Sequence, residues 1–212
     1  MKVKKPKIQM DLDWILDIFQ IEIQENTRHL QIWLAAHFEL PITTLQQLEN
    51  LSDLYKKEGD SWNEEELKIH FIAILLYIAQ PEEKGIIKVF LERNIKVETE
   101  HYLISVDVDL IFAKSKGLNT PQKPYFFLQE LKKGKNSAND PEAQMLIAMI
   151  ASQYLNEVSR IVYGGYVVGR FWFFATLENK VYSLSRAFDI TNIEDLKQVI
   201  FNLKKIKELV KD

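Results

Sequence analysis

The sequence predicts an α/β protein in which a mixed β-sheet is flanked by helices. Two apolar segments, residues 103–112 and 124–131, are rich in aliphatic and aromatic side chains and have the length of buried strands. A helical segment precedes this pair and another follows it, and further strands and a final helix complete the chain. This order of elements is typical of the α/β class.

Residues 1–60 are predicted to form a helical N-terminal extension. Apolar side chains recur at helical spacing within residues 11–38, and Pro41 interrupts that pattern. Thr43 or Thr44 is suited to cap a further helix after the proline. We therefore expect helices before the predicted core.

A stronger helix begins the predicted core, residues 61–212. Ser61 or Asn63 is suited to cap a helix that extends to Ala79, and the three glutamates at 64–66 favour its positively polarised first turn. One apolar face is predicted for this helix. It comprises Leu67, Phe71, Ile74, Leu75 and Ile78.

A strand-rich region follows this helix. Residues 94–100 alternate like a half-exposed strand, whereas residues 85–91 fit either a strand or a helix. Asp140, followed by Pro141, is a favourable start for a helix that should reach about Glu157.

The remaining segments predict three strands and a closing helix. Residues 161–168 fit a central strand, in which Gly164 and Gly165 permit close packing or a bulge. Residues 171–176 and 181–184 continue the sheet. A helix with apolar residues from Leu196 to Val210 ends the chain.

Composition places the chain among ordinary globular proteins. It has 212 residues, of which 47% are hydrophobic and 27% charged, which suffices for one well-filled core.

The absence of cysteine excludes disulfides and thiolate zinc sites, and it suits a reducing cytosol. The basic start, residues 1–7, lacks a following apolar region and so does not predict a signal peptide. The longest apolar run, 71–79, is too short to span a bilayer. We expect a cytoplasmic protein that is not inserted in a membrane.

Lysines are concentrated in one part of a chain whose net charge is −3. Between Lys114 and Lys135 the only acid is Glu130. A basic rim of this kind suits a phosphate backbone, and the alternative is a solvated loop with scattered lysines.

The two strands of the opening pair carry acids at positions where burial is costly. Asp107 and Asp109 share one face of the first strand, and Glu130 shares a face with Lys132 on the second. If the strands pair, one aspartate lies beside Glu130. Two carboxylates there would suit Mg²⁺ or Mn²⁺, and Lys132 could steer an attacking water. The alternative is that Glu130 and Lys132 end a strand at a solvent edge.

These motifs resemble those of a known superfamily. The string Asp109-Leu110-Ile111-Phe112, followed by residues 124–132 with Gln129-Glu130-Leu131-Lys132, resembles motifs II and III of the PD-(D/E)XK nuclease superfamily. The helix opening Asp140-Pro141-Glu142-Ala143-Gln144 is similar to that of bacterial members of unassigned function. The resemblance covers about residues 62–186.

The resemblance implies a restriction-endonuclease-like fold and a set of site residues. Asp109 and Glu130 would bind Mg²⁺ or Mn²⁺, and Lys132 would be the catalytic lysine. Gln144 would lie near the active site on the following helix, and Glu64 would be the acid from the first core helix. Two alternatives stay open, because Asp107 could replace Asp109 and Glu66 could replace Glu64.

The resulting hypothesis is a metal-dependent nuclease that hydrolyses phosphodiester bonds, with DNA as the expected substrate, in bacterial defence, repair or mobile-element biology. The first alternative is a catalytically silent nucleic-acid-binding or protein-interaction module on the same fold. The second is an assembly protein that forms a homodimer through its N-terminal helices, where Trp14 and Trp33 are candidates for an exposed surface, or through its C-terminal helix.

Overall fold

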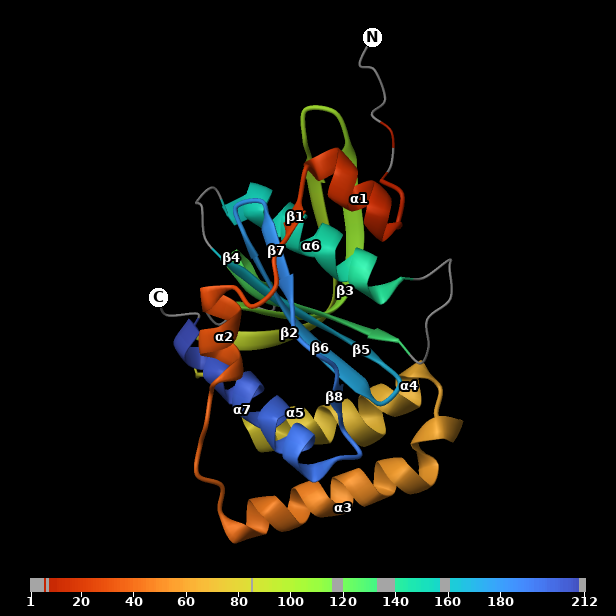
Figure 1. The fold of residues 1–212 in the computed structure, drawn as a ribbon, viewed down its shortest axis with the longest axis vertical. Coiled ribbons are helices and arrows are strands. Elements are labelled where there is room, and N and C mark those ends of the chain that lie inside the picture. The colour runs from red at the N-terminus through yellow and green to blue at the C-terminus, as the bar shows by residue number, and fades with distance from the viewer. Residues whose placement is uncertain are drawn as a thin grey trace.

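The chain folds into a mixed α/β structure (Figure 1). The computed structural model describes residue 6 and residues 8–84, 86–115, 120–132, 140–156 and 161–209, and for residues 123–132 it describes the backbone. No helix in these ranges is both long and apolar enough to cross a membrane.

The helical elements fall into an N-terminal group, the core helix α6 and the C-terminal α7. In chain order they are α1 (Leu12–Phe19), α2 (Arg28–Leu34), α3 (Ile42–Glu58), a 3-10 turn (Gly59–Ser61), α4 (Glu64–Leu67), a π-helical turn (Lys68–Ile72), α5 (Ala73–Ala79), α6 (Pro141–Asn156) and α7 (Ile193–Leu209). The strands are β1 (Glu22–Ile23), β2 (Ile87–Glu98), β3 (Leu103–Lys114), β4 (Gln122–Lys132), β5 (Val162–Val168), β6 (Phe171–Glu178), β7 (Val181–Leu184) and β8 (Phe188–Asp189).

The strands form one mixed sheet in the order β1-β7-β6-β5-β4-β3-β2, and β8 pairs with β6. Strands β2, β3 and β4 are antiparallel neighbours. Strand β4 pairs with β5 in parallel, and β1 pairs with β7 in parallel. Because two parallel strands need a crossover connection, α6 is the helix of the β4–α6–β5 unit. The prediction of a mixed sheet flanked by helices is confirmed.

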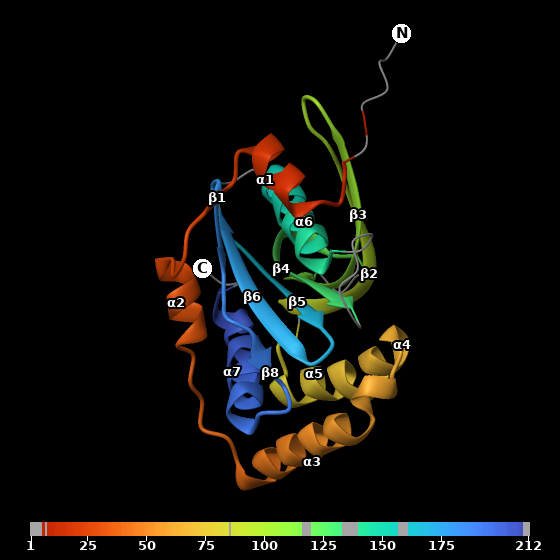
Figure 2. The same cartoon turned by 45° about the vertical axis from the view of Figure 1, so that its right-hand side comes forward.

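Helices cover both faces of the sheet and create two apolar cores (Figures 1 and 2). The first core, which we call the α5 core, joins one face to α2, α3, α4, α5 and α7. The second, the α6 core, joins the other face to α1 and α6. The N-terminal helices therefore contribute side chains to both cores.

The N-terminal segment is less regular than the single helical pattern predicted for residues 11–38. Helix α1 ends where Gln20 adopts a left-handed conformation with φ of 54°. The short strand β1 follows and extends the sheet beside β7 before α2 begins. Trp33 is fully buried and donates from Nε1 to the Asn202 carbonyl at 2.9 Å, so the expectation that it is exposed was wrong. Trp14 is half-buried and packs edge-on against Tyr102.

Helix α3 begins at Ile42, with Pro41 at the N-cap position and no side-chain cap. The prediction that Thr43 or Thr44 caps this helix was therefore wrong. Both threonines already lie within the first turn, where Thr44 N donates to the Pro41 carbonyl at 2.9 Å. The fixed φ of proline allows it to precede a helix directly.

The predicted core helix is confirmed, but a π-helical turn divides it into α4 and α5. A π turn contains one more residue than an α turn and so rotates the residues that follow. Ile72 and Ala79 are consequently buried beside the predicted apolar residues, whereas Ile74 is 40% exposed, in contrast to the prediction. The ambiguous segment 85–91 enters β2 at Ile87.

Gly164 permits the close approach of α6 to the sheet. A Cβ atom at this position would lie 2.7 Å from Met149 Sδ and 3.1 Å from Met145 Sδ on α6. The β5–β6 register runs without interruption through Gly164 and Gly165. Close packing is therefore the role observed at Gly164.

Candidate metal-dependent site

The even-numbered side chains of β3 change from one face of the sheet to the other at Asp109. On β3, Val108 belongs to the α6 core and Leu110 to the α5 core. Glu92 and Asp109 face one another between two paired positions of the hairpin, and Glu92 has a φ of 47°. A non-glycine residue in this left-handed region marks a local irregularity of the strand. The irregularity lies beside Asp109, and the Asp109 side chain is 13% exposed.

The helix opposite this hairpin is positioned by a capping box. Asn63 accepts a hydrogen bond from Glu66 N, and Glu66 accepts one from Asn63 N. These bonds satisfy two backbone donors at the helix start. They fix the first turn of α4, from which Glu64 and Glu65 project, and the π turn begins one turn later at Lys68.

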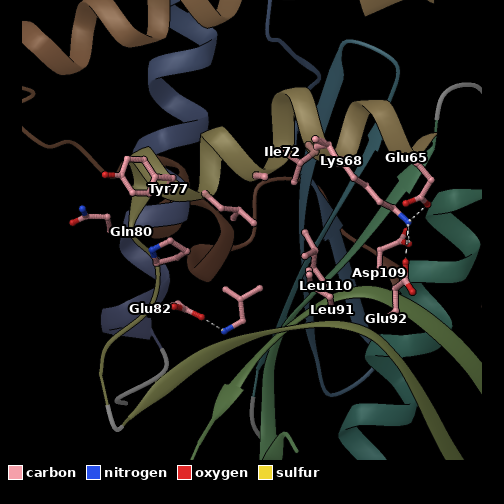
Figure 3. Close-up of a pocket in the computed structure, with 15 residues that line it drawn as sticks. Glu65, Lys68, Ile72, Tyr77, Gln80, Glu82, Leu91, Glu92, Asp109 and Leu110 are labelled. Atoms are coloured by element: carbon pink, nitrogen blue, oxygen red, sulfur yellow. Dashed lines mark hydrogen bonds and ion pairs between the residues drawn. The ribbon is translucent and has the colours of Figure 1, made fainter. Parts of the chain in front are cut away.

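Lys68 brings four carboxylates together, and Figure 3 shows three of them, those of Glu65, Glu92 and Asp109. Its Nζ lies 3.0 Å from Asp109 Oδ1 and 3.1 Å from Glu65 Oε1. Glu92 Oε1 lies 3.6 Å away and Glu64 Oε1 3.7 Å away. The ammonium thus joins α4 to the β2–β3 hairpin, and we call these five residues the Lys68 cluster.

Electrostatics in the Lys68 cluster favour the charged ammonium. Burial acts to lower the pKa of Lys68, but the hydrogen bond and charge of Asp109, and then those of Glu65, raise it above its ordinary value. The side chain of Lys68 is only 20% exposed, so water screens these contacts less than it would at a fully exposed pair.

The Lys68 cluster closes one end of a groove with a volume of about 760 Å³. The groove runs between the α4–α5 helix and the β2–β3 hairpin, and Tyr77 and Gln80 lie toward its other end (Figure 3). Most of its wall is apolar, and it includes exposed side chains of Ile69, Tyr77 and Leu91. Asp109 therefore lies at the border between an acidic cluster and an apolar groove.

Backbone pairing brings Asp109 and Glu130 to neighbouring strand positions. Leu110 pairs with Gln129 between the antiparallel strands β3 and β4, and Asp109 and Glu130 are the next residues on each strand. On its other side Glu130 pairs with Tyr166, and Lys132 pairs with Val168. The side chains of Glu130 and Lys132 lie outside the described part of the structure.

The two alternative acids have other contacts. Asp107 is exposed, and its Oδ1 accepts a hydrogen bond from Asn94 Nδ2 at 2.8 Å. Glu66 completes the capping box. Of the predicted aspartates and helix glutamates, Asp109 and Glu64 are therefore the ones that contact the Lys68 ammonium.

Gln144 lies in the first turn of α6, which packs against β4 and β5. The predicted start of this helix is confirmed, since Asp140 Oδ1 accepts from Glu142 N at 3.0 Å and its carbonyl accepts from Gln144 N at 3.0 Å. Gln144 Oε1 is buried and has no hydrogen-bond partner among the described residues. A buried side-chain oxygen without a hydrogen-bond partner is uncommon in folded proteins.

Four residues near this region were not predicted. Lys68, Glu65 and Glu92 complete the Lys68 cluster, and the spacing of Lys68 from Glu64 and Glu65, four and three residues, was an available signal. Glu142 is the fourth. It is only 8% exposed and accepts hydrogen bonds from Tyr166 and Tyr182.

The described donors suit a hard cation in their chemistry. Asp109 and Glu64 supply carboxylate oxygens, which Mg²⁺ and Mn²⁺ prefer, and a cation of the protein itself already lies between them. No group of three or more His, Asp or Glu side chains with metal-binding geometry occurs among the described side chains, to which Glu130 does not belong.

Of the lysines between 114 and 135, only Lys114 has a described side chain, so the predicted basic rim lies largely outside the described residues.

Comparison with models of known protein families gave no match, and comparison with curated proteins gave none either.

Proposed function

We propose that this protein is a metal-dependent nuclease of the PD-(D/E)XK superfamily that cleaves phosphodiester bonds, with DNA as its substrate. The observation that carries the proposal is the strand register beside Leu110 and Gln129, which makes Asp109 and Glu130 neighbours. The order of α4–α5, three antiparallel strands, α6 and the parallel strand β5 supports a restriction-endonuclease-like core.

In this proposal Asp109 and Glu130 hold Mg²⁺ or Mn²⁺, and Glu64 lies beside them on the first core helix. The bound ion would lower the pKa of a water ligand and neutralise charge on the scissile phosphate. Lys132 orients the attacking water and stabilises the negative charge that develops on the phosphate. Gln144 supplies a buried amide oxygen on the neighbouring helix.

A cleavage assay with matched variants tests the proposal. The purified protein is incubated with plasmid, linear duplex, single-stranded DNA or RNA, in Mg²⁺, in Mn²⁺ or in chelator. We expect metal-dependent cleavage of DNA, and a loss of about 100-fold or more in Asp109→Asn, Glu130→Gln and Lys132→Met. Asp107→Asn is the matched control, because it removes a carboxylate two residues away on the same strand.

Two results would contradict the proposal. The first is cleavage that persists in chelator, and the second is cleavage that is unchanged in both Asp109→Asn and Glu130→Gln. Retained activity in Asp107→Asn shows that the loss in Asp109→Asn is specific to that site.

One observation favours a second candidate, a catalytically silent nucleic-acid-binding module on the same fold. Asp109 already has a cationic partner in Lys68, so the protein neutralises this carboxylate without a metal ion. Calorimetric titration with Mn²⁺ separates the two candidates. DNA binding without any Mn²⁺ binding favours the module, whereas Mn²⁺ binding that Asp109→Asn abolishes favours the nuclease.

A further inference from the structure

Lys68 occupies the position of a cation within a carboxylate cluster. Four carboxylate oxygens lie within 3.0 to 3.7 Å of its Nζ, and they come from one helix and two strands. Neighbouring carboxylates repel one another, and this repulsion is stronger where water is partly excluded. The cluster therefore needs a positive charge at its centre, and Lys68 supplies it.

The four acids differ in exposure and fall into an outer pair and an inner pair. Glu65 and Glu92 are 68% and 70% exposed and form the outer rim. Asp109 is 13% exposed and Glu64 is 36% exposed, so they form the inner part. The inner pair contains the proposed metal ligand, and Lys68 contacts both of its members.

We propose that Lys68 is an exchangeable counter-ion of the metal site, which neutralises Asp109 until a divalent cation binds and displaces the ammonium. This inference rests on the proposed nuclease function, since it concerns the same carboxylates. Lys68 and a divalent ion compete for the Asp109 carboxylate, because an ammonium 3.0 Å from Oδ1 repels a second cation that binds there.

The surroundings of Lys68 allow the ammonium to leave without losing all of its partners. The groove of about 760 Å³ opens beside it, and the exposed carboxylates of Glu65 and Glu92 lie at that border. A four-carbon side chain can move its head between neighbouring acids while its stem stays in apolar contact. The displaced ammonium then remains at the mouth of the site, where it can contact a substrate phosphate.

Metal affinity provides the first test. Lys68→Met removes the competing charge, so we expect Mn²⁺ to bind about tenfold more tightly than to the wild-type protein in calorimetry. Lys68→Arg retains a cation and should bind no more tightly than wild type. Lys56→Met is the matched control, because Lys56 pairs with Asp53 on an exposed surface of α3. In chelator, Lys68→Met should melt at a lower temperature than wild type, and Mn²⁺ should restore it.

A second measurement uses the wild-type protein and does not depend on how the variants fold. Acetylation of lysines, quantified by mass spectrometry, reports how accessible each amine is. We expect Mn²⁺ to increase the acetylation of Lys68. Lys197, whose side chain is 26% exposed and paired with Glu194, is the internal reference and should not change.

The outcomes distinguish the two proposals. Equal Mn²⁺ affinity in wild type and Lys68→Met, or unchanged acetylation of Lys68, overturns the exchange; if Asp109→Asn abolishes Mn²⁺ binding in the same series, the nuclease proposal stands. An absence of Mn²⁺ binding in every variant overturns both.

Discussion

The Tyr166 hydroxyl donates a hydrogen bond of 3.0 Å to Oε2 of Glu142, and so ties strand β5 to the first turn of α6. Tyr182 of β7 donates to the other oxygen of the same carboxylate at 3.1 Å. Glu142 is therefore a buried acceptor shared by two strands. Because Glu130 pairs with Tyr166, this contact also supports the strand position on which the proposed site depends.

Removal of the Glu142 carboxylate should destabilise the protein. Glu142→Ala leaves two buried hydroxyl groups without their acceptor, and we expect the free energy of unfolding to fall by about 3 kcal/mol in urea denaturation. Glu142→Gln keeps one acceptor oxygen and should lose roughly half as much. Glu49→Ala, an exposed glutamate of α3, is the control and should change stability by less than about 0.5 kcal/mol. A similarly small change in Glu142→Ala would mean that the two hydroxyls find other partners.

Alkaline pH should destabilise the protein through its buried tyrosines. Burial, followed by the charge of Glu142, raises the pKa of both Tyr166 and Tyr182, and burial and the charge of Asp60 raise the pKa of Tyr55 to about 12. The folded protein then keeps protons that the unfolded chain releases above its ordinary pKa of 10.0. The stability contributed by these groups is therefore complete below pH 10 and declines as the pH rises beyond it.

Phenolate absorbance measured during an alkaline titration checks this prediction. Before unfolding, the absorbance should fall short of the value for all eight tyrosines of the chain, and urea at the same pH should restore the full value. Tyr182→Phe should remove part of the missing amplitude. Complete ionisation of the folded protein close to pH 10 would contradict the prediction.

Asp195 should stabilise the protein at neutral pH and lose this effect in acid. Its side chain is 17% exposed and accepts hydrogen bonds from Arg186 Nη2 at 2.6 Å and from Asp189 N at 2.9 Å. Burial acts to raise the pKa of Asp195, but these bonds and the charge of Arg186 lower it below the ordinary 3.8. The contribution is therefore present above that pH and lost as the pH falls through the lowered pKa.

Urea denaturation at several pH values measures the effect of Asp195. We expect Asp195→Asn to lower the free energy of unfolding by about 1–2 kcal/mol at pH 7, with a difference from wild type that shrinks below pH 4. Asp53→Asn is the control, because its pair with Lys56 is 75% exposed on the aspartate side and should contribute little. A pH-independent loss in Asp195→Asn would show that the carboxylate charge is not the cause.

Much of the fold follows from local pattern. The strands around Asp109 and Glu130 have long aliphatic and aromatic runs, and the start of α6 has an aspartate followed by proline. Both signals depend on residues close together in the chain, and both are confirmed by the elements observed. Trp33 shows the limit, because its burial depends on the Asn202 carbonyl 169 residues later in the chain.

The candidate site could also be predicted only in part, because some of its contacts join residues that are far apart in the chain. Asp109 and Glu64 were identified as candidates, and the structure brings both to Lys68. The spacing of Lys68 indicates its contacts with Glu64 and Glu65, but not its contacts with the distant β2–β3 hairpin. Glu92 was missed because its position depends on a left-handed backbone conformation in mid-strand. Neither cause is visible in the periodicity of the sequence.

Gln144 should show a conflict between stability and function. Its Oε1 is buried without a hydrogen-bond partner among the described residues, and such a group destabilises the folded state relative to a solvated one. Gln144→Met fills a similar volume with an apolar side chain, so we expect it to raise the free energy of unfolding by about 1 kcal/mol. If the amide oxygen serves the proposed site, the same variant should also lose metal-dependent cleavage of DNA, because functional groups are often retained at a cost in stability.

Thermal unfolding and cleavage, measured on the same preparations, test this conflict. Gln153→Met is the matched control on the same helix, because Gln153 Nε2 donates to the Leu177 carbonyl at 3.1 Å and its replacement should lower the melting temperature. A lower melting temperature in Gln144→Met would contradict the prediction, since it would mean that the amide is satisfied in the folded protein. Higher stability with unchanged cleavage would remove Gln144 from the proposed site, because the unsatisfied oxygen would then have no functional reason to be retained.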